Sequence, residues 1–572
     1  MTIFFSLHAL LLLIYTTFCC GAVFLSNNRL RGSEGAASTT LSTTNALNDE
    51  SKLLTNPIRY FARYTSEQGR RLVQRCASNI IEDLDETDFT IFESTTSKAT
   101  CLAMLRRSSE VLNIEEDHPA WAFAPLLDLD SSAPSISEMS RQLAEQMPWG
   151  IQEIQADQLA KGDANVTICV VDTGVAINHP DLRSGQINGT DLEGKSWRWD
   201  QDRAGHGTHV AGTIAAVGDN GKGVQGAGGF DLFVVRALSD SATGYESDIW
   251  KAVQACILRE VDIINLSLGT EHMSDFAKEL YSKAVEEHGI IMVAAAGNTA
   301  DETKYFPASH PSVISVGGTF TSGERYFSSV MNDQIEFVAP GDKILSTSVA
   351  TYALHTPDGF GYAAHRVVGV PEYAVKGDLV LCQVGKTCDD ADGGICLFNI
   401  GGADEMLEHV VEDCMNGGGK AAVFFNDERP MSKIENVYVM GRNTIPAICV
   451  SKDTGLKLVE QLDNHDKASF TVTVGDIGDD KVEYIYETMT GTSMASPHVA
   501  ASFALLKSHF WGCTNHQLRY ALALNAKHPE GGCDEGHGYG TVKVKDAYDW
   551  LVAQGGCGWE LPRKSSGGCT TL

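Results

Sequence analysis

Two kinds of hydrophobic pattern follow one another between residues 166 and 339. Between short polar or glycine-rich stretches, apolar runs predict buried strands over 166–172, 232–237, 261–268, 290–295, 313–317 and 336–339. Between them, apolar positions recur at helical spacing over 247–260 and 276–288. Strand and helix in turn predict an α/β fold of three layers, in which a mostly parallel sheet lies between helices.

A smaller domain is predicted ahead of this pattern. Strand-like segments at 59–64, 89–93 and 111–117 alternate with helical spacing at 67–84 and 99–107. This order predicts an α+β domain over residues 56–118. The preceding residues 23–55 are rich in Ser, Thr, Asn and Gly, a composition that predicts disorder.

Four polar side chains stand at the ends of predicted elements. Asp172 and Asn298 follow buried strands, at the sheet edge where α/β proteins collect catalytic groups. His206 opens a helix of small residues, and Ser493 opens the helix that follows a strand over 482–486. A serine at a helix N-terminus is usually an ordinary cap. Together with an acid, an imidazole and an amide, however, it completes a set for acyl transfer.

Five separated motifs resemble the subtilisin-like serine proteases. They are Asp-Thr-Gly at 172–174, His-Gly-Thr-His-Val-Ala-Gly at 206–212, Asn-Leu-Ser-Leu-Gly at 265–269, Ala-Gly-Asn at 296–298 and Gly-Thr-Ser-Met-Ala-Ser-Pro-His at 491–498. The chain order Asp, His, Ser is that of subtilisin. The resemblance implies a serine endopeptidase that cleaves polypeptides through an acyl-enzyme and requires no cofactor for the chemistry.

The resemblance assigns a role to each of these residues. Ser493 would attack the carbonyl, His206 would move the proton, Asp172 would orient the imidazole and Asn298 would bind the oxyanion. His209, one turn after His206, would be structural.

The resemblance also implies a peptide-binding cleft. An extended peptide would pair with residues 267–269 as an antiparallel strand. The pocket beside it would be lined by small residues, which suggests a large apolar or aromatic substrate side chain. The expected substrate-binding residues are Ser267, Leu268, Gly269, Ala296 and Gly297.

The protease pattern covers residues 147–348 and 481–552 and is interrupted by 349–480. This segment has strands at 376–382 and 445–450 and helices at 403–416 and 454–462. It resembles a protease-associated (PA) domain, a small α/β insert of secreted peptidases that would govern substrate access or protein contacts, or have no role of its own.

The α+β domain at 56–118 resembles the inhibitor-type propeptide of subtilisin-like enzymes. The resemblance implies a zymogen in which the propeptide acts as an intramolecular inhibitor. Activation cleavage is expected in the linker 119–146.

One metal site is implied by the resemblance, a structural calcium site beside a mature N-terminus at 147–151. Its ligands would be Glu145, Asp181, Asp219 and Asn220, whose oxygens suit this hard cation. Lys222 and the length of the loop 217–224 leave a solvated Asn-Gly turn as an equal alternative.

The N-terminus and the cysteines both favour secretion. The apolar stretch 3–18 predicts a signal peptide over 1–22, with an uncleaved anchor as the alternative. The sequence has 15 cysteines and no paired Cys-x-x-Cys, which favours disulfides over metal binding. For the end of the chain, including the tail 553–572, we expect Cys513–Cys533 and Cys557–Cys569. Cys169 and Cys256 are expected as core thiols, and Asn165 and Asn188 as glycan acceptors.

Composition excludes several partners. A net charge of −30 disfavours nucleic acid and anionic membranes, and no second apolar span is present, so we expect a soluble monomer. Two other functions fit the sequence less well. A binding protein on an inactive protease scaffold would usually lack one catalytic residue, and an esterase would need Gly-x-Ser-x-Gly and the order Ser, Asp, His.

Overall fold

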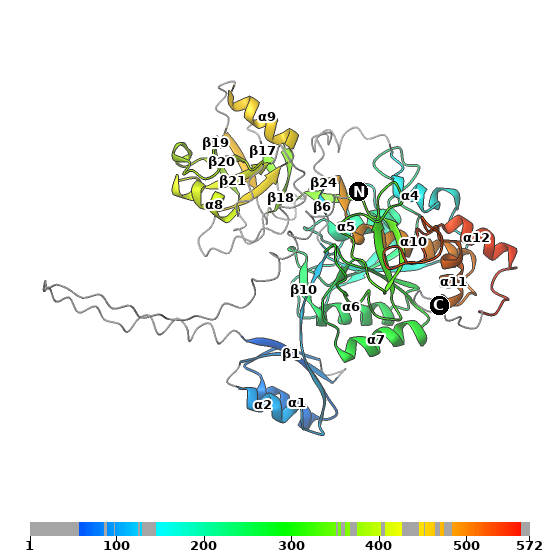
Figure 1. Ribbon diagram of the computed structural model, residues 1–572. Coiled ribbons are helices and arrows are strands. Elements are labelled where there is room, and N and C mark those ends of the chain that lie inside the picture. The colour runs from blue at the N-terminus through cyan, green and yellow to red at the C-terminus, as the bar shows by residue number, and fades with distance from the viewer. Residues whose placement is uncertain are drawn as a thin grey trace, which may run out of the picture. The chain divides into compact units, whose positions relative to one another are not determined.

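The computed structural model (Figure 1) describes thirteen stretches of the chain. They are residues 57–84, 88–95, 98–123, 126–127, 145–350, 353–355, 361–366, 374–401, 407–425, 445–450, 452–463, 469–473 and 483–561. All of them belong to one compact unit, Pro57–Leu572. The predicted signal peptide at 1–22, the predicted disordered segment at 23–55, most of the linker and the end of the tail lie outside the described residues.

A parallel sheet of seven strands forms the centre of the protease part. Its order is β15 (Ile335–Pro340), β14 (Ile314–Thr319), β13 (Ile291–Ala295), β11 (Ile263–Leu266), β7 (Thr167–Asp172), β9 (Asp231–Arg236) and β8 (Ile187–Thr190). Every neighbouring pair is parallel. The apolar runs of the sequence lie on these strands, because a parallel sheet covered on both faces buries every residue of a strand.

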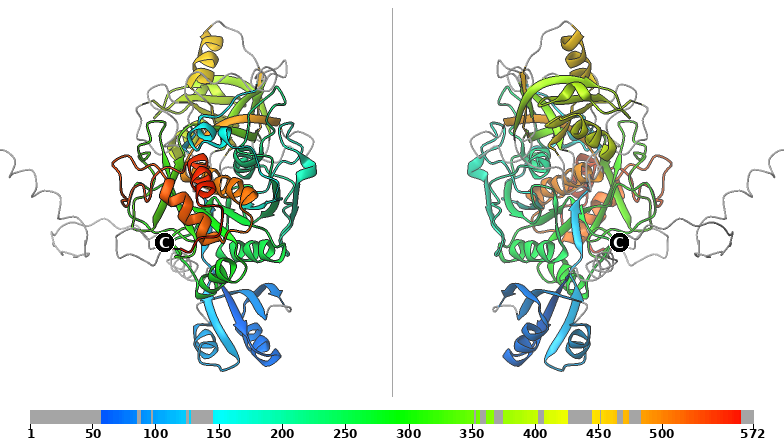
Figure 2. Two further views of the ribbon diagram at one scale, coloured as in Figure 1. Left: turned by 90° about the vertical axis from the view of Figure 1, so that its right-hand side faces the viewer. Right: turned by 90° about the vertical axis from the view of Figure 1, so that its left-hand side faces the viewer.

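Helices cover both faces of the sheet (Figures 1 and 2). Ile168 and Val170 of β7 pack on the side of α5 (His206–Ala215) and α10 (Thr492–His509). The alternate residues Cys169 and Val171 pack on the side of α6 (Glu246–Leu258) and α7 (Asp275–Glu286). The predicted three-layer fold is therefore confirmed.

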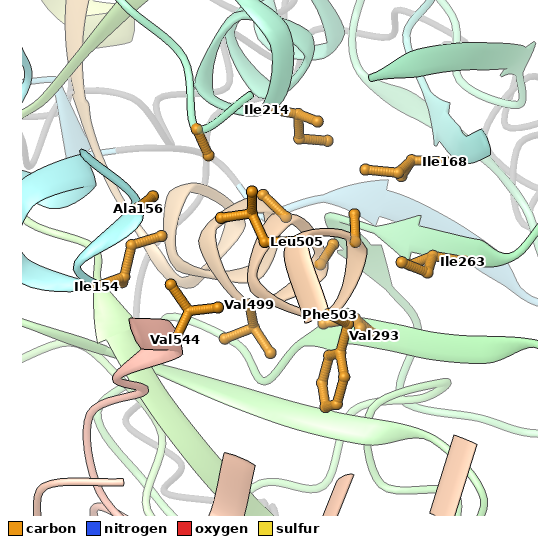
Figure 3. Close-up of a cluster of buried hydrophobic side chains, with 14 of the residues drawn as sticks. Ile154, Ala156, Ile168, Ile214, Ile263, Val293, Val499, Phe503, Leu505 and Val544 are labelled. Atoms are coloured by element: carbon orange, nitrogen blue, oxygen red, sulfur yellow. The ribbon is translucent and has the colours of Figure 1, made fainter. Parts of the chain in front are cut away.

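The helix α10 lies at the centre of the hydrophobic core on one face of the sheet. Figure 3 shows Val499, Phe503 and Leu505 of this helix in one hydrophobic cluster with Ile263 and Val293 of the sheet. These side chains are fully buried or nearly so, and each contributes about 1.5–3 kcal/mol by leaving water. The packing fixes the start of α10, and thereby Ser493, against the strand ends. The small helix α4 (Trp149–Glu153) and the last helices α11 (Asn515–Asn525) and α12 (Val544–Ala553) belong to the same core.

The N-terminal domain has two helices and an antiparallel sheet in the order β2 (Asn79–Leu84), β3 (Phe89–Ser94), β1 (Ile58–Tyr64) and β4 (Val111–Glu116). The helix predicted over 67–84 is wrong in its second half. Its first half is α1 (Glu67–Cys76), and the other helix is α2 (Ala99–Leu105). The chain leaves α1 at Ala77, whose backbone is extended, and the β-branched Ile80 then pairs with Phe92 of β3. Pairing across a sheet overrides the local helical spacing.

The inserted segment forms a closed barrel, a closure that the sequence pattern did not predict. Its strands follow the order β17 (Ala353–His355), β18 (Gly361–Arg366), β22 (Ala447–Val450), β21 (Ala421–Phe425), β20 (Ile395–Asn399), β19 (Val375–Cys382) and β23 (Ser469–Thr473). Two predicted helices are present as α8 (Leu407–Asn416) and α9 (Lys452–Asp463). The barrel interrupts a hairpin of the protease part, formed by β16 (Ile344–Ala350) and β24 (Glu483–Thr490).

Disulfides correct two sequence predictions. The bonds whose two cysteines both lie among the described residues include Cys76–Cys101, Cys169–Cys256, Cys382–Cys388, Cys396–Cys414 and Cys513–Cys557. Cys169 and Cys256 are thus not core thiols, because β7 and α6 present them to each other within one core. The expected Cys513–Cys533 and Cys557–Cys569 pairs are wrong, because Phe510 packs on Tyr548 of α12 and brings the segments of Cys513 and Cys557 together.

Among the described residues, no helix combines the length and apolarity that a membrane crossing requires.

Candidate active site

An aspartate and a histidine meet where β7 ends and α5 begins. Nδ1 of His206 donates to Oδ1 of Asp172 over 2.7 Å, and both side chains are buried. The same carboxylate oxygen accepts from the N–H of Thr173 over 2.7 Å. Helix and strand approach so closely that a Cβ on Gly207 would lie 2.1 Å from the carbonyl oxygen of Gly174. A glycine after the histidine is therefore a requirement of this contact.

Asp202 is a buried residue of this region that sequence reasoning missed. Its Oδ1 accepts from the N–H of Gly205, and its Oδ2 accepts from the N–H and hydroxyl of Thr208. It therefore caps α5 from outside the helix, in the way that a carboxylate stabilises a helix N-terminus. Burial raises the pKa of Asp202. The sequence feature that could have indicated this role is an aspartate four positions before His206, just ahead of the predicted helix.

Two opposing effects act on the imidazole of His206. Burial disfavours the charged imidazolium, while the carboxylate of Asp172, and more weakly that of Asp202, favour it; the net effect raises the pKa of His206. His209 differs, because its Nε2 faces the carbonyl oxygen of Ile344 at 2.9 Å and burial lowers its pKa to about 3. His209 is thus a neutral imidazole bonded to the backbone.

Ser493 is the second residue of α10, after an extended Gly491. Its Oγ lies within hydrogen-bonding distance of two carbonyl oxygens, 3.0 Å from that of Ser267 and 3.2 Å from that of Phe123. Nε2 of His206 is buried and makes no hydrogen bond within the described part of the chain. The serine hydroxyl is thus turned towards a peptide backbone rather than towards the imidazole.

The amide of Asn298 is held by its oxygen. Oδ1 accepts from the N–H and from the hydroxyl of Thr492, each over 3.0 Å, and from the hydroxyl of Tyr326. Three donors on one oxygen fix the orientation of the amide at the start of α10. Tyr326 is fully buried and is a second residue that sequence reasoning missed. It follows β14, the strand next to β13, and it lies in none of the motifs that pointed to the site.

We expect replacement of Tyr326 by Phe to lower kcat about tenfold with little change in KM. One of three bonds that orient the Asn298 amide is lost, and a single hydrogen bond is worth about 1–1.5 kcal/mol. Steady-state kinetics on a peptide substrate measure both constants. Tyr281→Phe, which removes another buried hydroxyl, is the control, and an equal loss of kcat in both variants would contradict the prediction.

A strand of the same chain pairs with residues 268–269, which are expected to bind substrate. β5 (Pro119–Ala122) lies between β10 (Thr243–Tyr245) and β12 (Leu268–Gly269) and is antiparallel to both. Further on, β6 (Leu126–Leu127) pairs with β24, which leads into α10. β5 and β6 are thus both paired with strands of the protease part, and the carbonyl of Phe123, directly after β5, lies at Ser493.

The side chain of Phe123 fills the predicted apolar pocket. It packs with Ala295, Ala296 and Tyr305, whose ring centre lies 4.9 Å from its own, and is only 3% exposed. A Cβ on Gly269 would lie 2.6 Å from the ring. Residues of the two expected pocket segments, 267–269 and 294–297, thus lie against Phe123, a contact that the sequence did not predict; substrate binding by these residues stays a prediction. The sequence feature that could have predicted this occupant is the pair of small residues Ala120 and Ala122 directly before the aromatic Phe123.

Three of the four expected calcium ligands lie together. Oδ1 of Asp181 accepts from the amide of Asn220 over 2.5 Å, and its Oδ2 accepts from the N–H of Val224 over 2.8 Å. The Glu145 carboxylate faces backbone N–H groups of the same loop at 3.4 Å. For Asp219 the described residues offer no bond to this cluster. A cation would have to displace the Asn220 amide from Asp181, so calcium binding stays a prediction.

The acceptor sequences for glycans differ in exposure. Asn165 and Asn188 are exposed, and glycosylation there stays a prediction. Asn265 is buried and bonded to Ser267 and Ser496.

These features define a class of protein. They are the features of a subtilisin-like serine endopeptidase: a parallel sheet between helices, an Asp–His pair at the carboxyl edge of the sheet, and a serine at a helix N-terminus beside an amide. Residues 163–364 and 447–540, more than half of the chain, match the Subtilase family. The chain belongs to this family.

Two subtilisins and one solved structure illustrate the similarity of this chain to known proteins. Subtilisin DY from Bacillus licheniformis is 38% identical over 213 residues, which cover 36% of this chain and 76% of that protein. Subtilisin NAT from Bacillus subtilis subsp. natto is 34% identical over 252 residues, 42% of this chain and 60% of that protein. Fervidolysin from Fervidobacterium pennivorans, a keratinolytic enzyme related to subtilisin, has a TM-score of 0.53 and 20% identity over 89% of this chain and 62% of that chain. This last likeness concerns the fold alone.

Proposed function

We propose that the protein hydrolyses internal peptide bonds of polypeptides through an acyl-enzyme and is made as a zymogen that its own N-terminal domain inhibits. One observation carries the proposal: the Ser493 hydroxyl lies 3.2 Å from a backbone carbonyl oxygen of a peptide that occupies the cleft as an antiparallel strand. A peptide in this position has the backbone pairing expected of a substrate.

The chemistry assigns one step to each side chain. Ser493 turns from the carbonyl of Ser267 to His206, gives its proton to Nε2 and bonds to the carbonyl carbon. The C–N bond then breaks, and the imidazolium returns the proton to the leaving amine. Asp172 holds the tautomer that leaves Nε2 able to accept, and Asn298 with the N–H of Ser493 stabilises the oxyanion. Water then releases the acyl group by the same route.

Contacts between the N-terminal domain and the protease part support the proposed inhibition. Asp117 accepts from the N–H and hydroxyl of Ser247, in the first turn of α6. Glu115 accepts from the N–H of Asp275 at the start of α7. Carboxylates at two helix N-termini satisfy unpaired N–H groups and interact favourably with the helix dipoles.

An apolar contact strengthens this docking. Phe61 and Phe89 of the N-terminal sheet pack on Trp250 of α6 and, through Phe89, on Phe276 of α7, with ring centres 4.6–6.0 Å apart. Trp250 is 1% exposed in this arrangement. Departure of the domain would expose this indole, so its fluorescence reports release.

Secretion is part of the proposal and is supported by the disulfides. Five bonds between described cysteines suit an oxidising compartment, in which they persist. The assignment of the barrel to PA domains stays a prediction.

An organophosphonate probe tests the proposed function. We expect the probe to form a covalent bond with Ser493, located by peptide mass spectrometry, in protein that hydrolyses casein after the N-terminal domain is removed. Label on another serine would overturn the assignment, and an intact, unlabelled protein that binds peptides without cutting them would favour the inactive-scaffold alternative.

A further inference from the structure

We propose that the loop between α11 and α12 binds a divalent transition-metal ion of the zinc class through His528, Asp534 and His537. One ligand atom of each residue lies within 4.8 Å of one ligand atom of each of the other two. None of the three residues belongs to the motifs that carry the active site. The proposal therefore does not depend on the proposed function.

The backbone of this loop brings the three side chains together. At its base, Lys527 and Thr541 exchange two backbone hydrogen bonds of 2.8 and 2.9 Å, so the intervening chain is a closed loop. Gly531 and Gly532 have φ values of +76° and +91°, which turn the chain back after His528. The sequence spacing of the ligands is thus converted into one compact cluster.

One carboxylate oxygen of Asp534 faces both imidazoles. Its Oδ2 lies 3.2 Å from Nε2 of His528 and 3.3 Å from Nδ1 of His537. A tetrahedral zinc ion with bonds of about 2.0–2.2 Å holds its ligand atoms about 3.3–3.6 Å apart. The other oxygen, Oδ1, accepts from the N–H groups of Gly536 and His537 over 2.8 and 2.7 Å. These two bonds fix the carboxylate with Oδ2 towards the rings.

Nε2 of His528 lacks the partner that a buried polar atom requires. The side chain is only 5% exposed, and Nε2 makes no hydrogen bond within the described part of the chain, although Oδ2 of Asp534 is 3.2 Å away. The ring nitrogen is therefore not aimed at the carboxylate oxygen itself. A buried polar atom without a partner is costly, and an ion bound beside Oδ2 would supply one.

Binding of the ion requires a change of tautomer at His528. Nδ1 of this ring accepts from the N–H of Glu530 over a long 3.2 Å. A ring that binds a metal through Nε2 carries its proton on Nδ1, so this contact would be lost. Glu530 is exposed, and its N–H can turn to water instead.

The donor set selects the kind of ion. Two imidazole nitrogens and one carboxylate oxygen suit Zn²⁺ and related transition metals, whereas Ca²⁺ and Mg²⁺ prefer oxygen ligands throughout. The neighbouring Cys533 is disulfide-bonded, so its sulfur is not available as a ligand. The Asp534 side chain is 46% exposed, which leaves room for entry of the ion and for water as a fourth ligand.

The site would stabilise the edge of the central sheet. β15 is the last strand on one side of this sheet. The loop pairs with it, because the N–H of Tyr539 donates to the carbonyl of Glu336 over 2.7 Å and the N–H of Val338 donates to the carbonyl of Gly540 over 3.1 Å. An ion that joins the start of the loop at His528 to its end at His537 would hold this pairing segment in place.

Zinc titration of the full-length, chelator-treated protein tests the site. With calcium present in excess, isothermal titration calorimetry is expected to show that each chain binds a Zn²⁺ ion. Asp534→Asn keeps an oxygen for the N–H groups of Gly536 and His537 but removes the charge, and His528→Gln removes a ring nitrogen. We expect both variants to bind Zn²⁺ at least about 100-fold more weakly, because even a residue that only orients a ligand contributes about 10–100-fold in affinity.

His516→Gln is the matched control. His516 faces Glu286 at 3.4 Å on the protein surface and thus removes a histidine from a carboxylate pair that lacks a second imidazole. We expect this variant to bind Zn²⁺ with the wild-type affinity. A wild-type protein that takes up no zinc, or equal affinities in the wild type, Asp534→Asn and His528→Gln, would overturn the proposal.

A second measurement guards against variants that fold poorly. Co²⁺ in place of Zn²⁺ is expected to give the wild type and His516→Gln the visible absorption of a tetrahedral site, and to give His528→Gln none. Zinc at about 100 times its Kd is expected to raise the Tm of the wild type by about 5 °C and to leave that of Asp534→Asn unchanged. The same Co²⁺ spectrum or the same rise in Tm with and without these ligands would overturn the proposal. Neither measurement uses peptide hydrolysis, so such a result would leave the proposed function intact.

Discussion

Replacement of Ser493 by Ala is expected to leave a full-length chain that never processes itself and that cleaves peptides roughly 10⁶-fold more slowly than the wild type. The variant removes the only atom that forms a covalent bond with the substrate, while the rest of α10 keeps its packing. Intact-mass measurement over time follows the processing, and hydrolysis of a chromogenic peptide follows the activity.

Ser502→Ala is the matched control for this variant. Ser502 lies in the same helix, is buried and donates to the carbonyl of His498, so its loss tests the effect of removing a hydroxyl from α10. We expect this control to process itself at the wild-type rate. A Ser493→Ala chain that still cuts itself at that rate would exclude Ser493 as the nucleophile.

Replacement of Asp172 by Asn is expected to lower kcat roughly 10⁴-fold, because an amide can present a donor to Nδ1 and so stabilise the tautomer that cannot accept the serine proton. The pH dependence changes as well. In the wild type, the carboxylate raises the pKa of His206 despite burial, so activity falls as the pH drops through a value above 6.5. Without that carboxylate, burial lowers the pKa, and the acid limb of kcat/KM moves to lower pH.

Asp262→Asn provides the comparison. This carboxylate accepts from the N–H of Thr167 at the opposite end of β7, so it perturbs the same strand without reaching the histidine. We expect its pH profile to match that of the wild type. An acid limb of Asp172→Asn that stays in place or moves to higher pH would show that the Asp172 charge does not act on His206.

The sheet and its helices could be predicted because their signals are local. The runs around Val170 and Val293 are apolar throughout, which suits only strands buried on both faces, and small residues such as Gly207 mark where helix and strand approach. The five motifs then placed Asp172, His206, Ser493 and Asn298 at strand ends and helix starts. These positions follow from the order of elements, so no distance had to be known.

Contacts between distant segments could not be predicted in the same way. Cys169 and Cys256 fit a core as thiols or as a disulfide, and only the packing of β7 on α6 decides between them. Phe123 lies in a linker whose composition is ordinary, and it becomes informative only when the fold brings it to Ser493. Ile80 fits a helix or a strand, and its partner in β3 decides.

The barrel enters and leaves the protease part at one point of the β16–β24 hairpin, where Ala350 and Glu483 are directly paired. Paired residues of antiparallel strands lie about 5 Å apart, a gap that a turn of a few residues closes. The barrel is therefore an insertion at a hairpin tip that leaves the protease fold unchanged. A shortened enzyme, with a tight turn in place of the barrel, would keep the register of both strands. During evolution, a domain can therefore be inserted, exchanged or deleted at this hairpin tip while the strands and helices that carry the catalytic residues keep their positions.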